Sequence, residues 1–421
     1  MQKAVDQHAQ SDRYSLILVG TEASAEAFRG AGYRSVRVTP HEEAVCAIVD
    51  REAVVDPTLS FFSDFILAVS DPDLRDRLAI RLGDTKCRWI DWHGVPPAEI
   101  LAKDGADALR ARVDAARPMW IDEVCLMSDV PESGPQKTYR TGFDLLDDHG
   151  FRLIRPAFMP VIGPYGSGKS VLIRQLACNL YRMHGWRTLI TSFEEKIKPR
   201  YQRDFRMHFI GDEDVNPDGE VRWVPKYSTG WTSEDIAKAD IEIENAFRFL
   251  RRKRNTVLDI NRLIDRIEYA VRVYGVDVVV IDPMNEIDHQ VPPGTSKTDY
   301  MGQVMMRLKQ LADDYSLLMI VCAHPPKAGV EKRSASGQLL TLNDGADTAH
   351  YGNKADIGWC VWRPGLEDDS PTYLHVDKIK DHDVMGKPTL AKIALNRLTG
   401  QFNITKIGYD EVSSELLGES A

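Results

Sequence analysis

The sequence has no long hydrophobic run, no paired cysteines and no apolar leader. No apolar stretch approaches the roughly 20 residues needed to cross a bilayer, so no membrane-spanning segment is predicted. Residues 1–13 are polar, and no secretory signal is expected. The six cysteines are scattered without a CxxC pair, which argues against a zinc site and favours reduced thiols. We therefore predict a cytoplasmic protein with no membrane partner.

An excess of positive charge is also missing. The formal net charge is −10, which excludes a uniformly basic nucleic-acid binder. A locally basic channel remains compatible with this value, because contact with phosphates depends on the local field. A chain of 421 residues exceeds one ordinary hydrophobic core, so two or three domains are expected.

The most informative segment is a glycine-rich loop between an apolar run (158–162) and a helix-like segment that continues to residue 184. It matches the P-loop pattern, whose backbone N–H groups surround a triphosphate at a helix N-terminus. We predict that Lys169 reaches the β- and γ-phosphates and that the Ser170 hydroxyl completes a Mg²⁺ shell, so the cofactors are ATP and Mg²⁺. A chance glycine loop is the alternative, and the full match disfavours it. The predicted nucleotide-binding residues here are Gly163, Pro164, Tyr165, Gly166, Ser167, Gly168, Lys169, Ser170 and Val171.

Polar residues end three further predicted strands. Glu194 follows 187–192, a strand that we expect beside the P-loop strand, where it could deprotonate the attacking water. Exposed glutamates are common at strand ends, and Glu195 is the neighbouring alternative. Asp282 closes the β-branched run 276–281 and is predicted to hold Mg²⁺ through water.

The third strand, 317–323, ends in His324, which is predicted to sense the γ-phosphate, with simple strand capping as the alternative. After this strand, residues 328–354 lack a strand pattern and are predicted to form a long loop. The loop could contact nucleic acid, or it could be an ordinary solvent-exposed surface loop. The segment 242–253 is predicted as a charged helix and 258–274 as an amphipathic one. Later strands are predicted at 357–362, 372–378, 390–395 and 402–407.

The first hundred residues or so alternate short strands with helices, which predicts a small α/β domain. Asp71 and Asp73 follow one strand directly. Two carboxylates there could bind Mg²⁺, or one of them could cap the next helix. Both interpretations stay open.

This segment resembles a TOPRIM domain through LILVGTEASAEAFRGAGY, FILAVSDPDLRDRLAIRLG and WIDWHGVPPAEILAKDGADALRA. The resemblance implies a glutamate after the first strand, where this chain has Gly20 and Thr21 with only Glu22 nearby. The Asp-x-Asp pair of the family is present as Asp71 and Asp73. The resemblance therefore implies a degenerate TOPRIM domain without primase activity.

The later motifs TGFDLLD, GPYGSGKS, TSFEEKIKPR, VVVIDPMNE, CAHPPK and HVDKIK…NRLTGQF resemble the RecA-like motor domain of DnaB-type replicative helicases, in particular Twinkle-like and phage-type primase–helicases. The resemblance implies a homohexameric ring that binds ATP between subunits and moves 5′→3′ on single-stranded DNA at a forked duplex. A separate primase or loader is a further implied partner. Glu194 is then the catalytic base, and Asn285 and His324 occupy sensor positions.

The family usually has Lys-x-Arg where this chain has Lys378-Ile379-Lys380. The resemblance implies that Lys380 reaches the nucleotide of the neighbouring subunit, although lysine lacks the bidentate fork of arginine. Arg363 and Arg397 are the spare candidates.

DNA contact is implied for two segments, 286–299 and 327–354, that would face the ring's centre and contact the DNA backbone. Their candidate residues are His289, Lys297, Lys332, Arg333, His350, Asn353 and Lys354.

The predicted fold class is α/β, with a RecA-like P-loop core preceded by a small TOPRIM-like domain. The expected organisation is a TOPRIM-like domain (1–117), a linker (118–140), the ATPase domain (141–410) and a flexible tail (411–421). Two alternatives remain: a RecA- or KaiC-like ATPase that binds DNA or regulates a partner without unwinding, and an active primase–helicase.

Overall fold

The computed structural model describes residues 15–49, 52–119, 126–127, 136–192, 197–215, 221–251, 258–336, 338–345, 350–364 and 370–416. The chain divides into two compact units. One comprises Met1–Pro135 with Tyr269–Gly275, and the other comprises Gln136–Glu268 with Val276–Ala421. Among the described residues, no helix is long and apolar enough to cross a membrane.

The first unit is built on a five-stranded sheet in the order β2-β1-β5-β6-β7. Its strands pair in parallel except for β6 with β7. An antiparallel pair, β3 and β4, lies outside this sheet. The strands are β1 (Ser15–Val19), β2 (Val36–Val38), β3 (Cys46–Val49), β4 (Glu52–Val55), β5 (Asp64–Ala68), β6 (Cys87–Trp89) and β7 (Arg117–Pro118).

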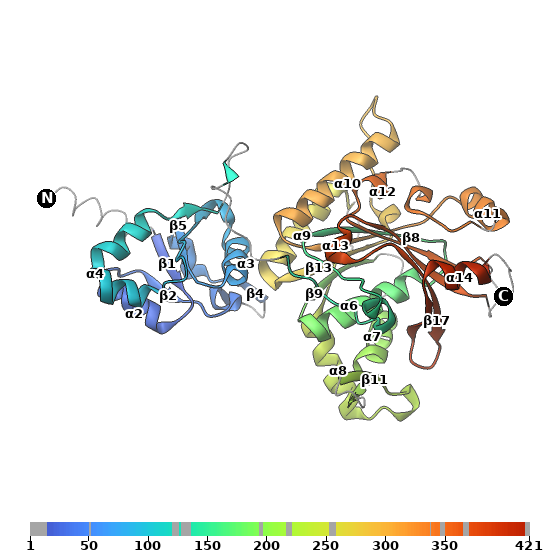
Figure 1. Cartoon of the computed structure of the whole chain (residues 1–421), viewed down its shortest axis with the longest axis horizontal. Helices are drawn as coiled ribbons and strands as arrows, with labels where there is room; N and C mark the ends of the chain where they lie inside the picture. The colour runs from blue at the N-terminus through green and yellow to red at the C-terminus, as the bar shows by residue number, and fades with distance from the viewer. Residues whose placement is uncertain are drawn as a thin grey trace. The chain divides into compact units, whose positions relative to one another are not determined.

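Alternate residues of β1 and β5 pack in two separate hydrophobic cores, because successive side chains of a strand point to opposite faces of the sheet. Leu16 and Leu18 pack with residues of α3 (Pro72–Leu82). Ile17 and Val19 pack with residues of α2 (Glu22–Gly30) and α4 (Pro97–Asp114). Burial on both faces explains the nearly continuous apolar sequence of these strands, and Figure 1 shows the sheet between its helices.

Asp71 caps the N-terminus of α3, and its Oδ1 accepts from the backbone N–H of Asp73 at 3.0 Å. The prediction that a carboxylate here caps the next helix is therefore confirmed for Asp71. Glu22 opens α2 and pairs with Arg29 at 2.6 Å. In the described part of the chain, no group of three or more His, Cys, Asp or Glu side chains could hold a metal ion.

The second unit contains a nine-stranded sheet in the order β12-β9-β13-β14-β8-β15-β16-β17-β18. The strands from β12 to β15 are parallel, and β16 to β18 continue the sheet as antiparallel strands. The strands are β8 (Ala157–Ile162), β9 (Arg187–Ser192), β12 (Phe247–Phe249), β13 (Val276–Asp282), β14 (Leu318–Ala323), β15 (Ile357–Trp362), β16 (Thr372–Ile379), β17 (Thr389–Asn396) and β18 (Gln401–Ile407).

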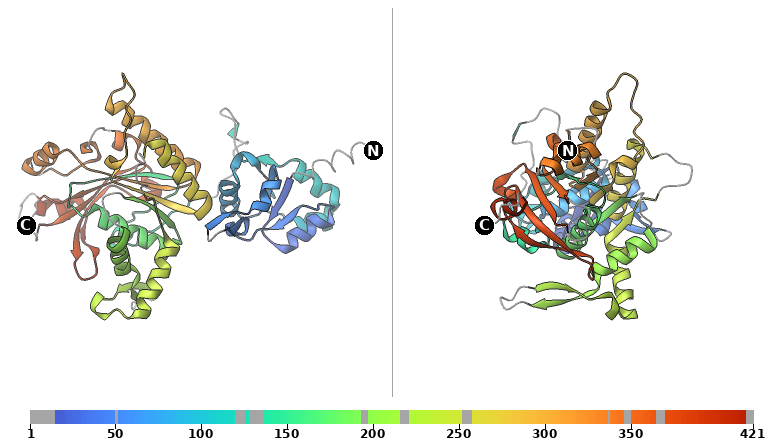
Figure 2. Two further views of the ribbon diagram at one scale, coloured as in Figure 1. Left: turned by 180° about the vertical axis from the view of Figure 1, so that it is seen from behind. Right: turned by 90° about the vertical axis from the view of Figure 1, so that its right-hand side faces the viewer.

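Helices cover both faces of this sheet. Figures 1 and 2 show α6 (Lys169–His184) and α7 (Gln202–Phe209) on one side, with α9 (Ile260–Tyr274) and α10 (Lys297–Asp314) on the other. The hairpin of β10 (Gly211–Val215) and β11 (Val221–Pro225) projects from the side of α7. Two further short helices are α5 (Asp144–Asp148) and α13 (His382–Met385).

Several elements differ from their predictions. The strand β9 pairs with β12 and β13 and not with β8, so the expected position beside the P-loop strand is wrong. The predicted helix 242–253 is α8 (Ser233–Ala246), and the chain then forms β12. The segment 328–354 was predicted as a loop, but it contains α11 (Lys327–Ser336) and α12 (His350–Lys354).

The prediction of a flexible tail at residues 411–421 is also wrong over its first residues. Residues Tyr409–Leu416 form α14, and Val412 is fully buried. The rest of the predicted tail, 417–421, lies outside the described residues.

Candidate functional site

Three neighbouring strands bring the predicted nucleotide-site residues to one edge of the sheet. The P-loop follows β8, Asp282 ends β13, and His324 follows β14. These strands are parallel and adjacent in the order β13-β14-β8. Their carboxyl ends therefore meet at the same edge, where α/β sheets generally bind ligands.

The P-loop has the backbone shape that its glycines predict. Gly166 and Gly168 have φ of +73° and +92°, a region that favours glycine. A Cβ on Gly163 would lie 2.5 Å from the carbonyl of Val361, so a side chain cannot fit there. A Cβ on Gly168 would meet the Phe402 ring at 2.7 Å. The loop is thus fixed from the side of β15 and from the side of β18.

Lys169 is buried beneath the P-loop. Its Nζ donates to the carbonyls of Gly163 at 2.6 Å and Pro164 at 3.1 Å. It also lies 3.1 Å from Nδ1 of His324. The ammonium is therefore held by two carbonyls of the P-loop and by the histidine that follows β14, at the base of the predicted phosphate cradle.

His324 is buried between the P-loop and β14. Burial first, and then the positive charge of Lys169, lower the pKa of His324 to about 4. The imidazole is therefore neutral at pH 7. The ring of Tyr165 stacks on it, with centroids 3.7 Å apart and an interplanar angle of 17°.

The residues at this edge fit a magnesium–nucleotide complex. The Ser167 hydroxyl is buried and has no hydrogen-bond partner among the described residues. A bound ligand inside the loop could therefore supply the hydrogen bond that this hydroxyl lacks. Ser170 and Asp282 line the same small cavity. A hydroxyl and a carboxylate oxygen suit Mg²⁺, which usually takes one or two protein ligands beside substrate phosphates.

Three residues of the site, Cys322, Phe402 and Gln175, were missed by sequence reasoning because they approach it only in three dimensions. Cys322 lies beneath Asp282, and burial, with the Asp282 charge adding to it, raises its pKa well above the ordinary value. Phe402 packs on Gly168, and its backbone exchanges two hydrogen bonds with the Gln175 side chain at 2.9 and 2.7 Å. Tyr165 was assigned to nucleotide binding, but its stack on His324 was not foreseen.

The predicted catalytic base, Glu194, lies outside the described residues, as does Glu195. The strand that precedes Glu194 in the chain, β9, ends level with β13, because Ser192 pairs with Asp282. Asn285 lies in a short 3₁₀ turn after β13 and is exposed. Val171 lies in the first turn of α6.

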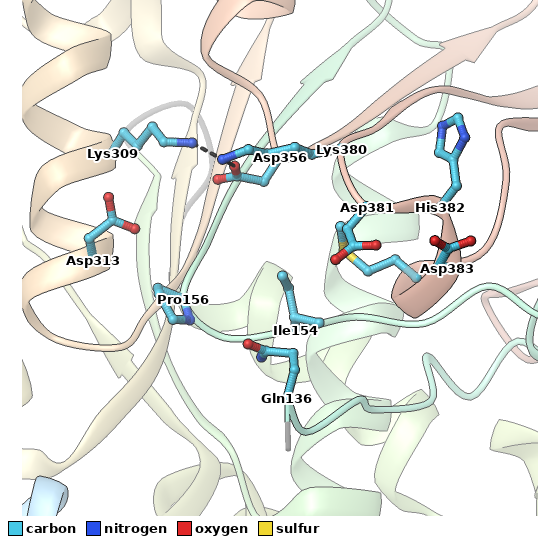
Figure 3. Close-up of a pocket in the computed structure, with 11 residues that line it drawn as sticks. Gln136, Ile154, Pro156, Lys309, Asp313, Asp356, Lys380, Asp381, His382 and Asp383 are labelled. Atoms are coloured by element: carbon cyan, nitrogen blue, oxygen red, sulfur yellow. Dashed lines mark hydrogen bonds and ion pairs between the residues drawn. The ribbon is translucent and has the colours of Figure 1, made fainter. Parts of the chain in front are cut away.

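Lys378 and Lys380 lie at the opposite edge of the sheet from the P-loop of the same chain. Lys378 donates to the carbonyl of Gly352 at 2.6 Å, and burial lowers its pKa. Lys380 is exposed, and its Nζ lies 3.4 Å from Asp356, which also accepts from Lys309 at 2.6 Å. Figure 3 shows Lys309, Asp356 and Lys380 at the wall of a pocket. The volume of this pocket is about 660 Å³. A contact of Lys380 with a neighbouring subunit stays a prediction.

The predicted DNA-contacting residues are spread over the segments that follow β13 and β14. Lys332 and Asn353 are exposed, whereas Arg333 pairs with Asp344 at 3.1 Å. His289 lies near the Met284 carbonyl at 3.2 Å. The His350 ring packs against Gly302. The remaining two are Lys297, the first residue of α10, and Lys354, the last residue of α12.

Comparisons with known proteins agree with this geometry. A family model described as an AAA domain matches residues 149–330. A Twinkle homolog of Arabidopsis thaliana, chloroplastic/mitochondrial, is 26% identical over 353 residues, which are 78% of this chain and 48% of that protein. The chain thus spans about half the length of the curated relative that it matches.

Solved structures are also similar. The ATPase domain of G40P aligns with a TM-score of 0.49 at 18% identity, covering 63% of this chain and 91% of that one. A DnaB-like replicative helicase aligns with a TM-score of 0.48 at 17% identity, covering 72% of each chain.

In the sheet, β14 lies between the P-loop strand β8 and the strand β13 that ends in Asp282. This strand order supports the predicted α/β P-loop fold without reference to any known protein. The resemblance predicted from the sequence is therefore confirmed as a similarity: the chain is similar to a Twinkle homolog over 78% of its length, and residues 149–330, which include the P-loop, match the AAA-domain model.

Proposed function

We propose that this protein is an ATP-driven, ring-forming DNA helicase that translocates 5′→3′ on single-stranded DNA. The observation that carries the proposal is the meeting of Lys169, Asp282 and His324 at one edge of a parallel sheet. The similarity to a Twinkle homolog supports DNA as the partner. The TOPRIM-like unit is proposed to lack primase activity.

In the proposed reaction, Ser170 and Asp282 would hold Mg²⁺, the second through water. When bound, this ion would supply charge neutralisation on the transferring phosphoryl group. The Lys169 ammonium moves from the carbonyls of Gly163 and Pro164 to the β- and γ-phosphate oxygens. Glu194 orients and deprotonates the attacking water.

The coupling to DNA is proposed to run through the two segments that follow β13 and β14, since Asp282 ends β13 and His324 directly follows β14. A shift of either strand end on loss of the γ-phosphate would move the segment that follows it. Exposed cations on these segments, such as Lys332, would contact the DNA backbone with little base specificity. Lys380 is proposed to act on the nucleotide of the next subunit.

The decisive experiment measures ATP hydrolysis and strand separation together. Purified protein is assayed on a forked duplex with a labelled strand, with and without ATP, and on forks that carry only a 5′ or only a 3′ tail. ATP-dependent separation that requires the 5′ tail supports the proposal. DNA-stimulated hydrolysis that never separates a fork would favour a RecA- or KaiC-like ATPase, and primer synthesis from labelled ribonucleotides would indicate a primase–helicase.

Two substitutions test the assigned chemistry. Lys169→Ala is expected to abolish ATP turnover, because the cradle loses the ammonium that is proposed to meet the β- and γ-phosphates. Glu194→Gln is expected to retain nucleotide binding, measured with a fluorescent ATP analogue, and to lower turnover by about 10²-fold or more. Glu195→Gln is the matched control. If Glu195→Gln lost turnover while Glu194→Gln kept it, the base would be Glu195.

A further inference from the structure

The stack of Tyr165 on His324 is the contact in the P-loop that the proposed mechanism does not use. The ring centroids lie 3.7 Å apart and the planes are nearly parallel, at 17°. Tyr165 itself is 64% exposed, whereas His324 is 7% exposed. The stack therefore buries the histidine and leaves the tyrosine largely in solvent, so its purpose is not to fill the core.

The contacts of His324 decide which of its nitrogens carries the proton. Nδ1 lies 3.1 Å from Nζ of Lys169 and 3.2 Å from the carbonyl of Gly163. An ammonium can only donate. A proton on Nδ1 could be donated to the Gly163 carbonyl, but it would also face the ammonium, which lies nearer, and this carbonyl already accepts from Lys169 at 2.6 Å. The favoured neutral tautomer therefore accepts from Lys169 at Nδ1 and carries its proton on Nε2.

This tautomer makes a specific donor available to a phosphate. A neutral imidazole whose Nδ1 is engaged by Lys169 presents Nε2–H as its remaining polar group. A flip of the ring would remove Nδ1 from Lys169 and redirect Nε2. An aromatic ring stacked on the imidazole opposes tilting of its plane, and such pairs change an equilibrium by about two- to twelvefold.

We propose that Tyr165 is a positioning residue of the nucleotide site: its stack holds His324 in the orientation that accepts from Lys169 and presents Nε2–H to a bound phosphate. The inference rests on the proposed nucleotide site and assigns to Tyr165 a role through His324 rather than through direct contact with nucleotide. It predicts that Tyr165 acts on turnover more than on binding.

The test is steady-state ATP hydrolysis without DNA by the full-length protein. Tyr165→Ala is expected to lower kcat about three- to tenfold and to change KM for ATP less than twofold. Tyr165→Phe keeps the ring and is expected to recover most of this loss. Tyr227→Ala removes a tyrosine that is 54% exposed and distant in sequence, and it is the matched control with unchanged turnover.

A double-mutant cycle with His324→Ala separates this role from the alternatives. If Tyr165 acts through His324, Tyr165→Ala has no further effect once His324 is alanine. Additive losses would overturn the inference, because they would show that Tyr165 acts by itself, for example on the nucleotide base. Equal kcat for Tyr165→Ala and wild type would also overturn it.

A pH profile gives a readout that a purely structural role would not move. The charged groups that face His324 are Lys169 and Asp282, beside the Gly163 carbonyl. Loss of the covering ring exposes the imidazole and raises its pKa toward 6.5, so turnover of Tyr165→Ala should fall between pH 7.5 and pH 6 while wild-type turnover stays level. If the wild type bound no ATP, the proposed function itself would fail, which is a separate outcome.

Discussion

At the scale of single residues, one buried carboxylate organises the entry into the ATPase core. Asp147 accepts from the backbone N–H of Thr141 at 2.8 Å, from its hydroxyl at 2.9 Å and from the backbone N–H of Gly142 at 2.9 Å. The side chain of Asn179 on α6 donates to the Thr141 carbonyl at 3.2 Å. The motif TGFDLLD thus forms a turn whose backbone is anchored to the helix that follows the P-loop.

Replacement of Asp147 tests this anchor. Asp147→Ala leaves buried donors without an acceptor and should lower the free energy of unfolding by about 2–4 kcal/mol. Asp148→Ala, on the same short helix with a side chain that is 65% exposed, should change it by less than about 0.5 kcal/mol. Urea denaturation followed by circular dichroism measures both. Equal effects of the two substitutions would contradict the anchoring role.

A second residue-scale prediction concerns pH. Burial first, and then the charges of Arg182 and Arg174, lower the pKa of His208 from its ordinary 6.5 to about 3. Between these pH values the unfolded chain binds a proton that the folded chain does not. The free energy of unfolding therefore falls as pH falls from 6.5 toward 3, by up to about 1.4 kcal/mol per pH unit from this group.

Substitution by phenylalanine isolates this contribution. His208→Phe keeps a ring in the buried position and removes the titration, so its free energy of unfolding should depend less on pH between 6.5 and 5 than that of the wild type. His149→Phe, at an exposed position, should retain the wild-type dependence. Urea denaturation at several pH values provides the comparison, and an unchanged slope for His208→Phe would refute the assignment.

At the scale of elements, the strands of the ATPase core were predictable because each is a short, largely apolar run bounded by polar residues. Predicted strand 276–281 corresponds to β13 and 317–323 to β14, each within a residue or two. The order of the strands was not predictable from sequence adjacency. The strand β9 follows β8 in the chain, but β13 and β14 lie between them in the sheet.

Two local patterns also misled the prediction. The helix α11 has no buried residue, so it shows none of the apolar periodicity that indicates a surface helix. The segment Phe247–Phe249 places two aromatic side chains around Arg248, which suits a strand better than the charged helix predicted through it. In the site, contacts such as that of Phe402 with Gly168 join distant segments, and no short sequence window reveals them.

The contact of β18 with the P-loop yields the element-scale prediction. Phe402 is buried against Gly168 and bonded to Gln175 through its backbone. Phe402→Ala should lower the free energy of unfolding of the second unit by about 3–5 kcal/mol and weaken binding of a fluorescent ATP analogue. Leu398→Ala, in the same hairpin and 63% exposed, is the control and should change neither quantity. Unaltered nucleotide affinity in a folded Phe402→Ala protein would contradict support of the loop by β18.

At the scale of the whole molecule, the chain has separate hydrophobic cores. Leu18 and Phe28 belong to the cores of the first unit, and Phe158 and Trp359 are fully buried in the second. Each unit thus has what an independently folding domain requires. The predicted nucleotide-site residues within the described chain lie in the second unit, whereas Asp71 and Asp73 lie in the first.

This division predicts how ATP changes thermal unfolding. Scanning calorimetry should show two transitions, because separate cores unfold as separate cooperative units. A ligand that binds only the folded second unit stabilises it by about 2.7 kcal/mol at a hundredfold excess over Kd, which corresponds to about 5–10 °C for a unit of this size. A non-hydrolysable ATP analogue with Mg²⁺ should therefore raise the temperature of one transition and leave the other unchanged.

The Lys169→Ala protein should retain both transitions and lose the shift, since the ammonium that meets the phosphates is gone. The transition of the first unit is identified as the one that a truncated chain of residues 136–421 lacks. If the analogue shifted both transitions, or only that of the first unit, nucleotide binding would lie outside the P-loop unit.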